Sequence, residues 1–319
     1  MVKRFRFVLG RRAVIVFLAL MVAVVAFLQV PLMDQSLAEY LPLGNHAEVT
    51  IPTQSTVEDR FRVEPSKEGL LLSTGNGGTW TQVTGSATPV ARSGHAMATT
   101  PSGMVLFGGL SVSYLNDTWR FDAIAMSWSS VSTSTQPSIR YQHAMAATPS
   151  GVLLFGGYSK NGTATCFNDT WLFNTTSNTW GRLTFTASIP PARRAHAMAA
   201  TPSGVLLFGG GASDSTNLND TWFFDFSTSS WAQLLTSPTP PARRAHAMAA
   251  TPSGVLLFGG IEGSSTDCAD TWLFDNATRR WSEVTGLTFT PTKREFQAMT
   301  AMSSGVLLFG GWGGSGSPT

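Results

Sequence analysis

The sequence predicts an all-β fold built from repeated antiparallel sheets, and three observations support this. A segment containing Ala-Met-Ala, Pro-Ser-Gly and Leu-Phe-Gly-Gly recurs along the chain. Its Gly-Gly pairs start at residues 108, 156, 209, 259 and 310, with spacings of 48, 53, 50 and 51 residues. Gly, Ser and Thr are abundant, which favours turns and short strands over long helices. Because such a sheet cannot bury both faces alone, neighbouring sheets are expected to pack face to face around an axis, as in a β-propeller.

Each complete repeat is expected to supply four strands. The first begins at His-Ala-Met, Pro-Ser-Gly forms a turn, and Val-Leu-Leu-Phe is a buried second strand. Gly-Gly then lets the chain leave this strand in conformations that a Cβ atom would forbid. Asn-Asp-Thr-Trp marks the third strand, and a second tryptophan nine residues later marks the fourth. The pairs are Trp119 and Trp128, Trp171 and Trp180, Trp222 and Trp231, and Trp272 and Trp281.

These motifs resemble the kelch repeat. The resemblance rests on an arginine before the first strand, an apolar second strand that ends in Gly-Gly, and the paired tryptophans, and it covers residues 69–311. It implies a kelch-type β-propeller whose function is carried by its loops, and it does not imply one activity.

The two ends of the repeat region predict how the propeller closes. Residues 69–85 contain only the second half of a repeat, whereas residues 292–311 contain only the first half and are followed by a flexible tail, 312–319. Residues 80–85 match residues 281–286 closely. The sequence therefore predicts five blades, the fifth shared between the termini. The alternative is a piece of a larger propeller, which would leave open sheet edges.

The N-terminal region predicts attachment to a membrane. Residues 13–33 carry no charge and have about the length that spans a bilayer. A basic tail, 1–12, precedes them, and no Lys or Arg follows before Arg60, so the positive-inside rule places the N-terminus in the cytosol and the propeller outside it. Residues 34–68 would be a linker. The alternative is a signal peptide cleaved near residue 38 and a secreted propeller.

Charge argues against one class of partner and suggests another. Five of the 21 basic residues precede the hydrophobic segment, which leaves 16 against 19 acidic residues and excludes a general nucleic-acid footprint. Half of those 16 fall where one blade crosses to the next, at the same end as the strand 2–3 loops, whose lengths vary. They predict a ring that binds an anionic protein or glycan: Arg92, Arg140, Arg193, Arg194, Arg243, Arg244, Lys293 and Arg294. The alternative is structural pairing with the repeat aspartates Asp117, Asp169, Asp220 and Asp270.

Residues with catalytic or metal-binding potential are few. One histidine recurs per repeat, and a fixed repeat position favours packing over metal binding; these are His95, His143, His196 and His246, with Gln297 in the fifth repeat. Cys166 and Cys268 are too few for a zinc site or a disulfide framework. Galactose oxidase shares the kelch scaffold, but its Tyr and Cys cofactor cannot be matched to this chain. We therefore expect a non-enzymatic interaction module without cofactor or metal, with a carbohydrate-active enzyme or oxidase of that type as the alternative.

Two sequons are the best candidates for N-glycosylation if the chain is exported through a eukaryotic secretory pathway. They begin at Asn161 and Asn276, which fall in the more variable loops.

Overall fold

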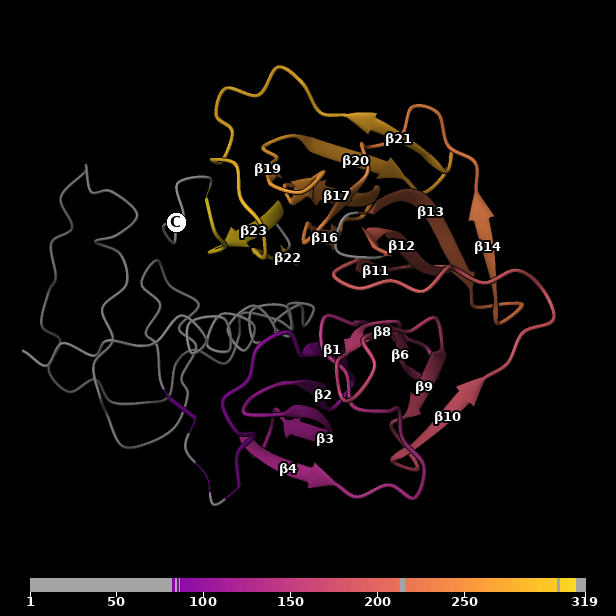
Figure 1. Cartoon of the computed structure of the whole chain (residues 1–319), viewed down its shortest axis with the longest axis vertical. Helices are drawn as coiled ribbons and strands as arrows, with labels where there is room; N and C mark the ends of the chain where they lie inside the picture. The colour runs from indigo at the N-terminus through magenta and orange to yellow at the C-terminus, as the bar shows by residue number, and fades with distance from the viewer. Residues whose placement is uncertain (1–81, 84, 86, 213–215, 303–304, 314–319) are drawn as a thin grey trace, which may run out of the picture.

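The computed structural model describes residues 82–83, 85, 87–212, 216–302 and 305–313, and throughout this part the protein is all β. The blades follow one another around a central axis in chain order (Figure 1). This confirms the predicted kelch-type propeller. The basic tail, the hydrophobic segment 13–33, the linker 34–68 and most of the half-repeat 69–85 lie outside the described residues. Within the described part, no helix is long and apolar enough to cross a bilayer.

Four sheets have four antiparallel strands each, as predicted. Blade 1 contains β1 (Ala96–Thr100), β2 (Gly103–Leu110), β3 (Tyr114–Asp122) and β4 (Ser127–Val131). Blade 2 contains β5 (Ala144–Thr148), β6 (Gly151–Phe155), β9 (Thr170–Asn174) and β10 (Thr179–Leu183). Blade 3 contains β11 (Ala197–Thr201), β12 (Gly204–Gly211), β13 (Asn217–Asp225) and β14 (Ser230–Leu234). Blade 4 contains β16 (Ala247–Ala250), β17 (Gly254–Phe258), β20 (Thr271–Asp275) and β21 (Arg280–Glu283).

The strand 2–3 loops differ in form as well as in length. In blades 1 and 3 the long second and third strands continue to the loop, with an irregularity in register at Gly-Gly. In blade 2 a separate ladder of β7 (Tyr158–Ser159) and β8 (Thr165–Cys166) takes their place. In blade 4 the corresponding sheet contains β15 (Arg243–Arg244), β18 (Ile261–Glu262) and β19 (Thr266–Asp267).

The core lies between blades, where the second strands and the tryptophans of neighbouring sheets meet. In the interface between blades 2 and 3, the ring of Phe155 contacts the edge of Trp231 with centroids 5.4 Å apart. Trp231 Nε1 also donates a hydrogen bond of 3.0 Å to Thr170 Oγ1 in blade 2. Trp180 and Trp281 make the same bond to the threonine of the preceding blade. The fourth-strand tryptophan therefore joins adjacent blades through both packing and a buried hydrogen bond.

Backbone hydrogen bonds link successive blades close to the axis. The amide of Gln142 donates to the carbonyl of Gly94, that of Ala195 to Gln142, that of Ala245 to Ala195, and that of Phe296 to Ala245, at 2.6–2.8 Å. All five residues have φ between 52° and 61°, which is the left-handed region. The chain thus turns sharply at one position in every repeat, and these turns surround the axis.

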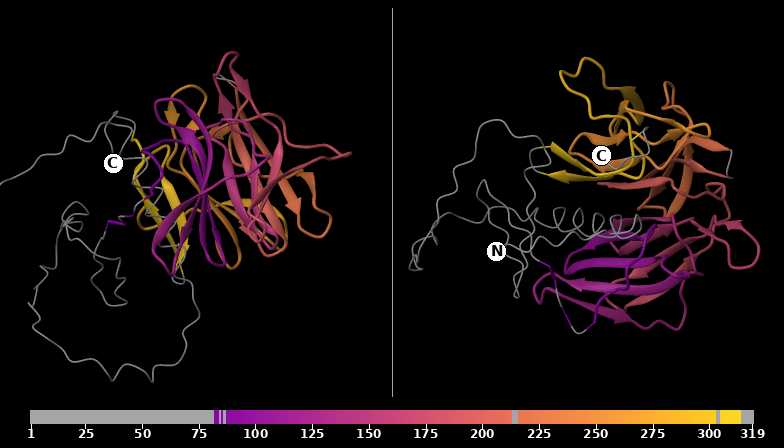
Figure 2. Two further views of the ribbon diagram at one scale, coloured as in Figure 1. Left: turned by 90° about the horizontal axis from the view of Figure 1, so that it is seen from below. Right: turned by 60° about the vertical axis from the view of Figure 1, so that its left-hand side comes forward.

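The fifth repeat is a two-stranded sheet in the described part, with β22 (Ala298–Met302) and β23 (Gly305–Phe309). This sheet and blade 1 are the two ends of the described arc (Figures 1 and 2). Leu307 is 36% exposed, whereas the corresponding Leu153 and Leu206 are fully buried. The predicted third and fourth strands of this blade lie almost wholly outside the described residues, so five-blade closure stays a prediction. One described residue agrees with it, because Val83 packs on blade 1 where Val131 packs on blade 2.

Candidate functional site

The crossing segments and the strand 2–3 loops meet at one end of the propeller, as predicted. The residue after each repeat arginine is paired with the residue after Gly-Gly. The pairs are Ser93 with Leu110, Tyr141 with Tyr158, Arg194 with Gly211, Arg244 with Ile261, and Glu295 with Trp312. We call this end the loop face. Its side chains therefore come from all five repeats.

The first arginine of each complete repeat is buried. Arg92, Arg140, Arg193 and Arg243 have side chains that are 0% exposed. Arg193 shows the pattern: Nη1 and Nη2 donate to the two carboxylate oxygens of Asp220 at 2.7 and 2.6 Å. Its Nη1 also donates to the carbonyl of Gly209, and its Nε donates to that of Pro191. This structural pairing was the alternative to ligand binding, and it takes these four residues out of the predicted ring of accessible cations.

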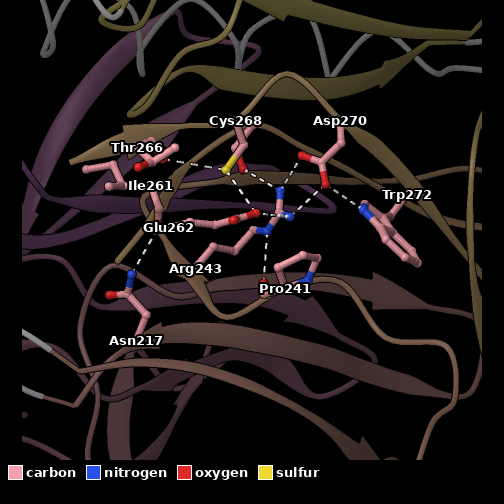
Figure 3. Close-up of polar contacts among 10 residues, drawn as sticks. Asn217, Pro241, Arg243, Ile261, Glu262, Thr266, Cys268, Asp270 and Trp272 are labelled. Carbon is pink, nitrogen blue, oxygen red and sulfur yellow. Dashed lines mark hydrogen bonds and ion pairs between the residues drawn. The ribbon is translucent and has the colours of Figure 1, made fainter. Parts of the chain in front are cut away.

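The aspartates of these pairs are held as carboxylates. Burial alone would raise the pKa of Asp220, but the hydrogen bonds from Arg193 and Trp222 lower it below its usual value. The same Arg–Asp–Trp set recurs in each complete blade. Blade 4 extends it, since Arg243 also contacts Glu262 at 3.1 Å and Cys268 Sγ lies 3.4 Å from the same carboxylate oxygen (Figure 3). Burial raises the pKa of the Cys268 thiol to about 12.

The other four basic residues of the predicted ring differ from these. Arg194 is half-buried and lies over the ring of Tyr158 in blade 2, 4.6 Å from its centroid. Arg244 is half-buried and donates to Asn217 Oδ1 and to the carbonyl of Gly263. Lys293 is exposed. Arg294 occupies the position of the buried arginines, but its contacts are to Gly310 O and to Thr292.

A cavity of about 510 Å³ opens at the axis between the crossing segments. All five repeats line it, each through two or three of the residues that follow its arginine, and Trp312 of the fifth repeat is added to these. The lining residues are Ser93, Gly94 and His95, then Tyr141, Gln142 and His143, then Ala195 and His196, then Ala245 and His246, and finally Glu295, Phe296, Gln297 and Trp312. A volume of this size is typical of small-molecule or side-chain binding sites.

The four repeat histidines form the base of this arrangement as neutral imidazoles. Burial, together with the positive charges of the nearby Arg92 and Arg243, lowers the pKa of His95 to about 4 and that of His246 to about 3. His246 also contacts the edge of Phe208. Gln297, at the same position in the fifth repeat, donates to the carbonyl of Phe258 at 2.6 Å. Among the described residues, no group of three His, Cys, Asp or Glu side chains is placed to hold a metal.

Aromatic residues gather beside the cavity. The chain has four tyrosines, and three of them form one edge-to-face series across blades 1 and 2. Tyr141 is at its centre, 5.4 Å from Tyr114 and 5.6 Å from Tyr158 between ring centroids. Arg194 covers the outer ring, Tyr158. This cluster has no signal in the sequence, because the three tyrosines occupy different positions of the repeat.

The cysteines and sequons are not among the residues that line the cavity. Cys166 and Cys268 are in the loops of blades 2 and 4, and both are thiols. Asn161 is exposed on the β7–β8 loop, and Asn276 is half-buried in the β20–β21 turn.

The sequence does carry a signal for the cavity. In the repeat Arg-x-x-His, the arginine and the histidine are constant and buried in blades 2 to 4. The two residues that follow the arginine vary among the repeats, although blades 3 and 4 share the same pair, and they line or border the cavity. They are Ser-Gly, Tyr-Gln, Arg-Ala, Arg-Ala and Glu-Phe. The constant and the variable positions of the repeat therefore distinguish the framework from the candidate site.

Two comparisons with known proteins bear on this arrangement. A family model described as the KLHDC2/KLHL20/DRC7 Kelch-repeats domain matches residues 62–260, which is more than half of the chain. No curated protein matches the chain.

Proposed function

The chain belongs to the kelch-repeat family of the KLHDC2/KLHL20/DRC7 type, and we propose that it is a protein-interaction module that binds a peptide segment of a partner at the loop face. Binding is proposed rather than catalysis, which keeps the non-enzymatic interpretation of the sequence.

One observation carries the proposal, namely that the side chains around the cavity vary on a constant frame. The buried Arg–Asp pairs and the buried histidines repeat from blade to blade, whereas the two residues that follow each of these arginines form four different pairs in the five repeats. Variation of this kind, on a rigid scaffold, is how loops acquire specificity. A peptide with several different side chains would use such a surface better than a small symmetric ligand.

The tyrosine cluster supports a protein ligand. Tyrosine and arginine are enriched in binding hot spots because they supply a large contact area with few rotatable bonds, together with polar ends. Tyr114, Tyr141 and Tyr158 are all partly exposed, and Arg194 lies over the last of them. Tyr141 also lines the cavity, so the cluster and the cavity share this residue.

A direct test is to pan the full-length chain, held in detergent, against phage-displayed random peptides. The dissociation constants of the enriched peptides are then measured with wild type and Tyr141→Ala. We expect about a tenfold loss for Tyr141→Ala, a loss typical of a hot-spot aromatic. Arg182→Ala is a control that alters an exposed residue on β10. Failure to enrich any peptide, with enrichment of an oligosaccharide on a glycan array instead, would contradict the proposal.

We also propose that the module is tethered to a membrane through residues 13–33 and lies outside the cytosol, where the exposed Asn161 would be accessible to glycosylation. The uncharged segment and the five basic residues before it support this proposal. Protease treatment of intact membrane vesicles should spare the propeller. Full release by alkaline carbonate would contradict an uncleaved anchor.

A further inference from the structure

The axial cavity has one charged side chain among the described residues that line it, and that charge is negative. Glu295 supplies it, whereas the lining imidazoles are neutral because burial lowers their pKa values. Arg194 and Arg244 border the cavity but do not line it. The residues of the predicted ring are positively charged, whereas Glu295, the one charged residue among the described lining residues, is negative.

The carboxylate of Glu295 is only partly satisfied. Its Oε2 atom is buried and accepts no hydrogen bond. The neighbouring guanidinium of Arg244 is directed to Asn217 and to the carbonyl of Gly263. Burial raises the pKa of Glu295, and the nearby Asp267 raises it further while Arg244 lowers it. A buried carboxylate oxygen without a donor costs free energy that a bound donor would recover.

Another buried acceptor atom and several aromatic residues belong to the lining of the same cavity. Gln297 is 7% exposed, yet its Oε1 atom is buried without a donor. Glu295 and Trp312 exchange backbone hydrogen bonds at 2.9 Å, so their side chains are direct neighbours. Phe296 and Tyr141 also line the cavity. A carboxylate, an amide oxygen and aromatic rings are the groups that bind an alkylammonium or guanidinium cation.

We infer that the axial cavity binds a basic side chain, a lysine ammonium or an arginine guanidinium, with Glu295 as the residue that selects for positive charge. The inference rests on the proposed function, since the basic side chain would belong to the bound peptide. The cavity volume of about 510 Å³ accommodates such a side chain together with part of its backbone. Specificity would then divide between the cavity, which reads the basic residue, and the tyrosine cluster, which contacts the residues beside it.

The test uses the full-length chain and three small probes: N-acetyl-lysine methylamide, its arginine counterpart and its norleucine counterpart. Norleucine keeps the alkyl stem and lacks the charge. Ligand-observed NMR titration should show a preference of about tenfold for at least one basic probe over norleucine, the effect of a partly desolvated ion pair. The lysine and arginine arms distinguish an ammonium site from a guanidinium site.

Glu295→Gln should bring the basic probes to within about twofold of norleucine, with an unchanged melting temperature. Glu283→Gln, the same change at an exposed position of β21, should leave the preference intact. Equal binding of charged and neutral probes, an unchanged preference in Glu295→Gln, or no saturable binding of either basic probe would overturn the inference. Panned peptides that bind without a basic residue would overturn it and leave the proposed function standing. Binding of the basic probes without any enriched peptide would overturn the proposed function and leave the cation site in the cavity standing.

Discussion

Arg193 and Arg194 are adjacent in the chain and have different roles in the structure. Arg193 has a fully buried side chain that donates four hydrogen bonds to Asp220, Gly209 and Pro191. Arg194 is half-buried on the loop face and covers Tyr158. Arg243 and Arg244 repeat the difference in blade 4. The comparison teaches that the first arginine of each pair holds its blade together, whereas the second lies on the loop face, where the proposed ligand would bind.

The largest effect should come from removing the carboxylate of a constant pair. Asp220→Ala leaves the guanidinium of Arg193 buried without its counter-ion, which is expected to cost about 3–5 kcal/mol of unfolding free energy. Urea unfolding followed by tryptophan fluorescence measures this loss. Glu283→Ala, at an exposed position, is the control and should change stability by less than about 0.5 kcal/mol. A loss for Asp220→Ala as small as that of the control would mean that the pair is not structural.

The second effect is a pH dependence at the constant histidine. Because the folded-state pKa of His246 is about 3 and its usual value is 6.5, the unfolded chain binds the proton first as pH falls. Its contribution to stability is therefore present above about pH 6.5 and is lost as the pH falls toward 3. His246→Gln copies Gln297 and removes this group. As the pH is lowered from about 6 to about 4, the unfolding free energy should fall less steeply in His246→Gln than in wild type. The two slopes should differ by about 1.4 kcal/mol per pH unit.

Guanidinium unfolding at a series of pH values checks this prediction. Parallel curves for wild type and His246→Gln would contradict a buried neutral imidazole, whatever the absolute stability of the variant. The remaining carboxylates and histidines titrate in both proteins, so the difference between the curves isolates His246.

A smaller effect should come from the hydrogen bond that the fourth-strand tryptophan makes to the neighbouring blade. Trp231 Nε1 donates to the hydroxyl of the buried Thr170 in the preceding blade. Trp231→Phe should cost about 1–3 kcal/mol more in the wild-type background than in a Thr170→Val background, because only the former leaves a buried hydroxyl without its donor. Equal losses in thermal or urea unfolding would show that the hydrogen bond adds nothing to the interface.

Most of the fold could be predicted from the sequence, because each blade repeats the same short signals. Pro-Ser-Gly, the apolar second strand and the two tryptophans each mark a strand or turn, and the structure has a turn or bend at Pro-Ser and strands at the others. Gly156 and Gly157 also have the expected role: a Cβ atom on either would lie 2.8 Å from an atom of a crossing segment, Arg193 O or His143 Cβ. Such local requirements are visible in a single sequence.

The candidate site was predicted only in part. The crossing segments that carry the arginines lie at the same end as the strand 2–3 loops, as predicted, but sequence alone could not decide between an accessible cation and a buried one. That choice depends on Asp220, which is 27 residues away from Arg193 in the chain and reaches it only through strand pairing. The tyrosine cluster and the unpartnered Oε2 of Glu295 depend on contacts between blades, and no periodicity within a repeat reports them.

The most direct test of the central claim compares Arg193→Ala with Arg194→Ala in the full-length chain. Each variant is measured for unfolding free energy and for affinity toward a peptide enriched by the wild type. We predict that Arg193→Ala loses about 3–5 kcal/mol of stability. Arg194→Ala should keep stability within about 0.5 kcal/mol and lose about tenfold in affinity. Equal stability losses in the two variants, or unchanged affinity in Arg194→Ala, would contradict the division between framework and binding positions.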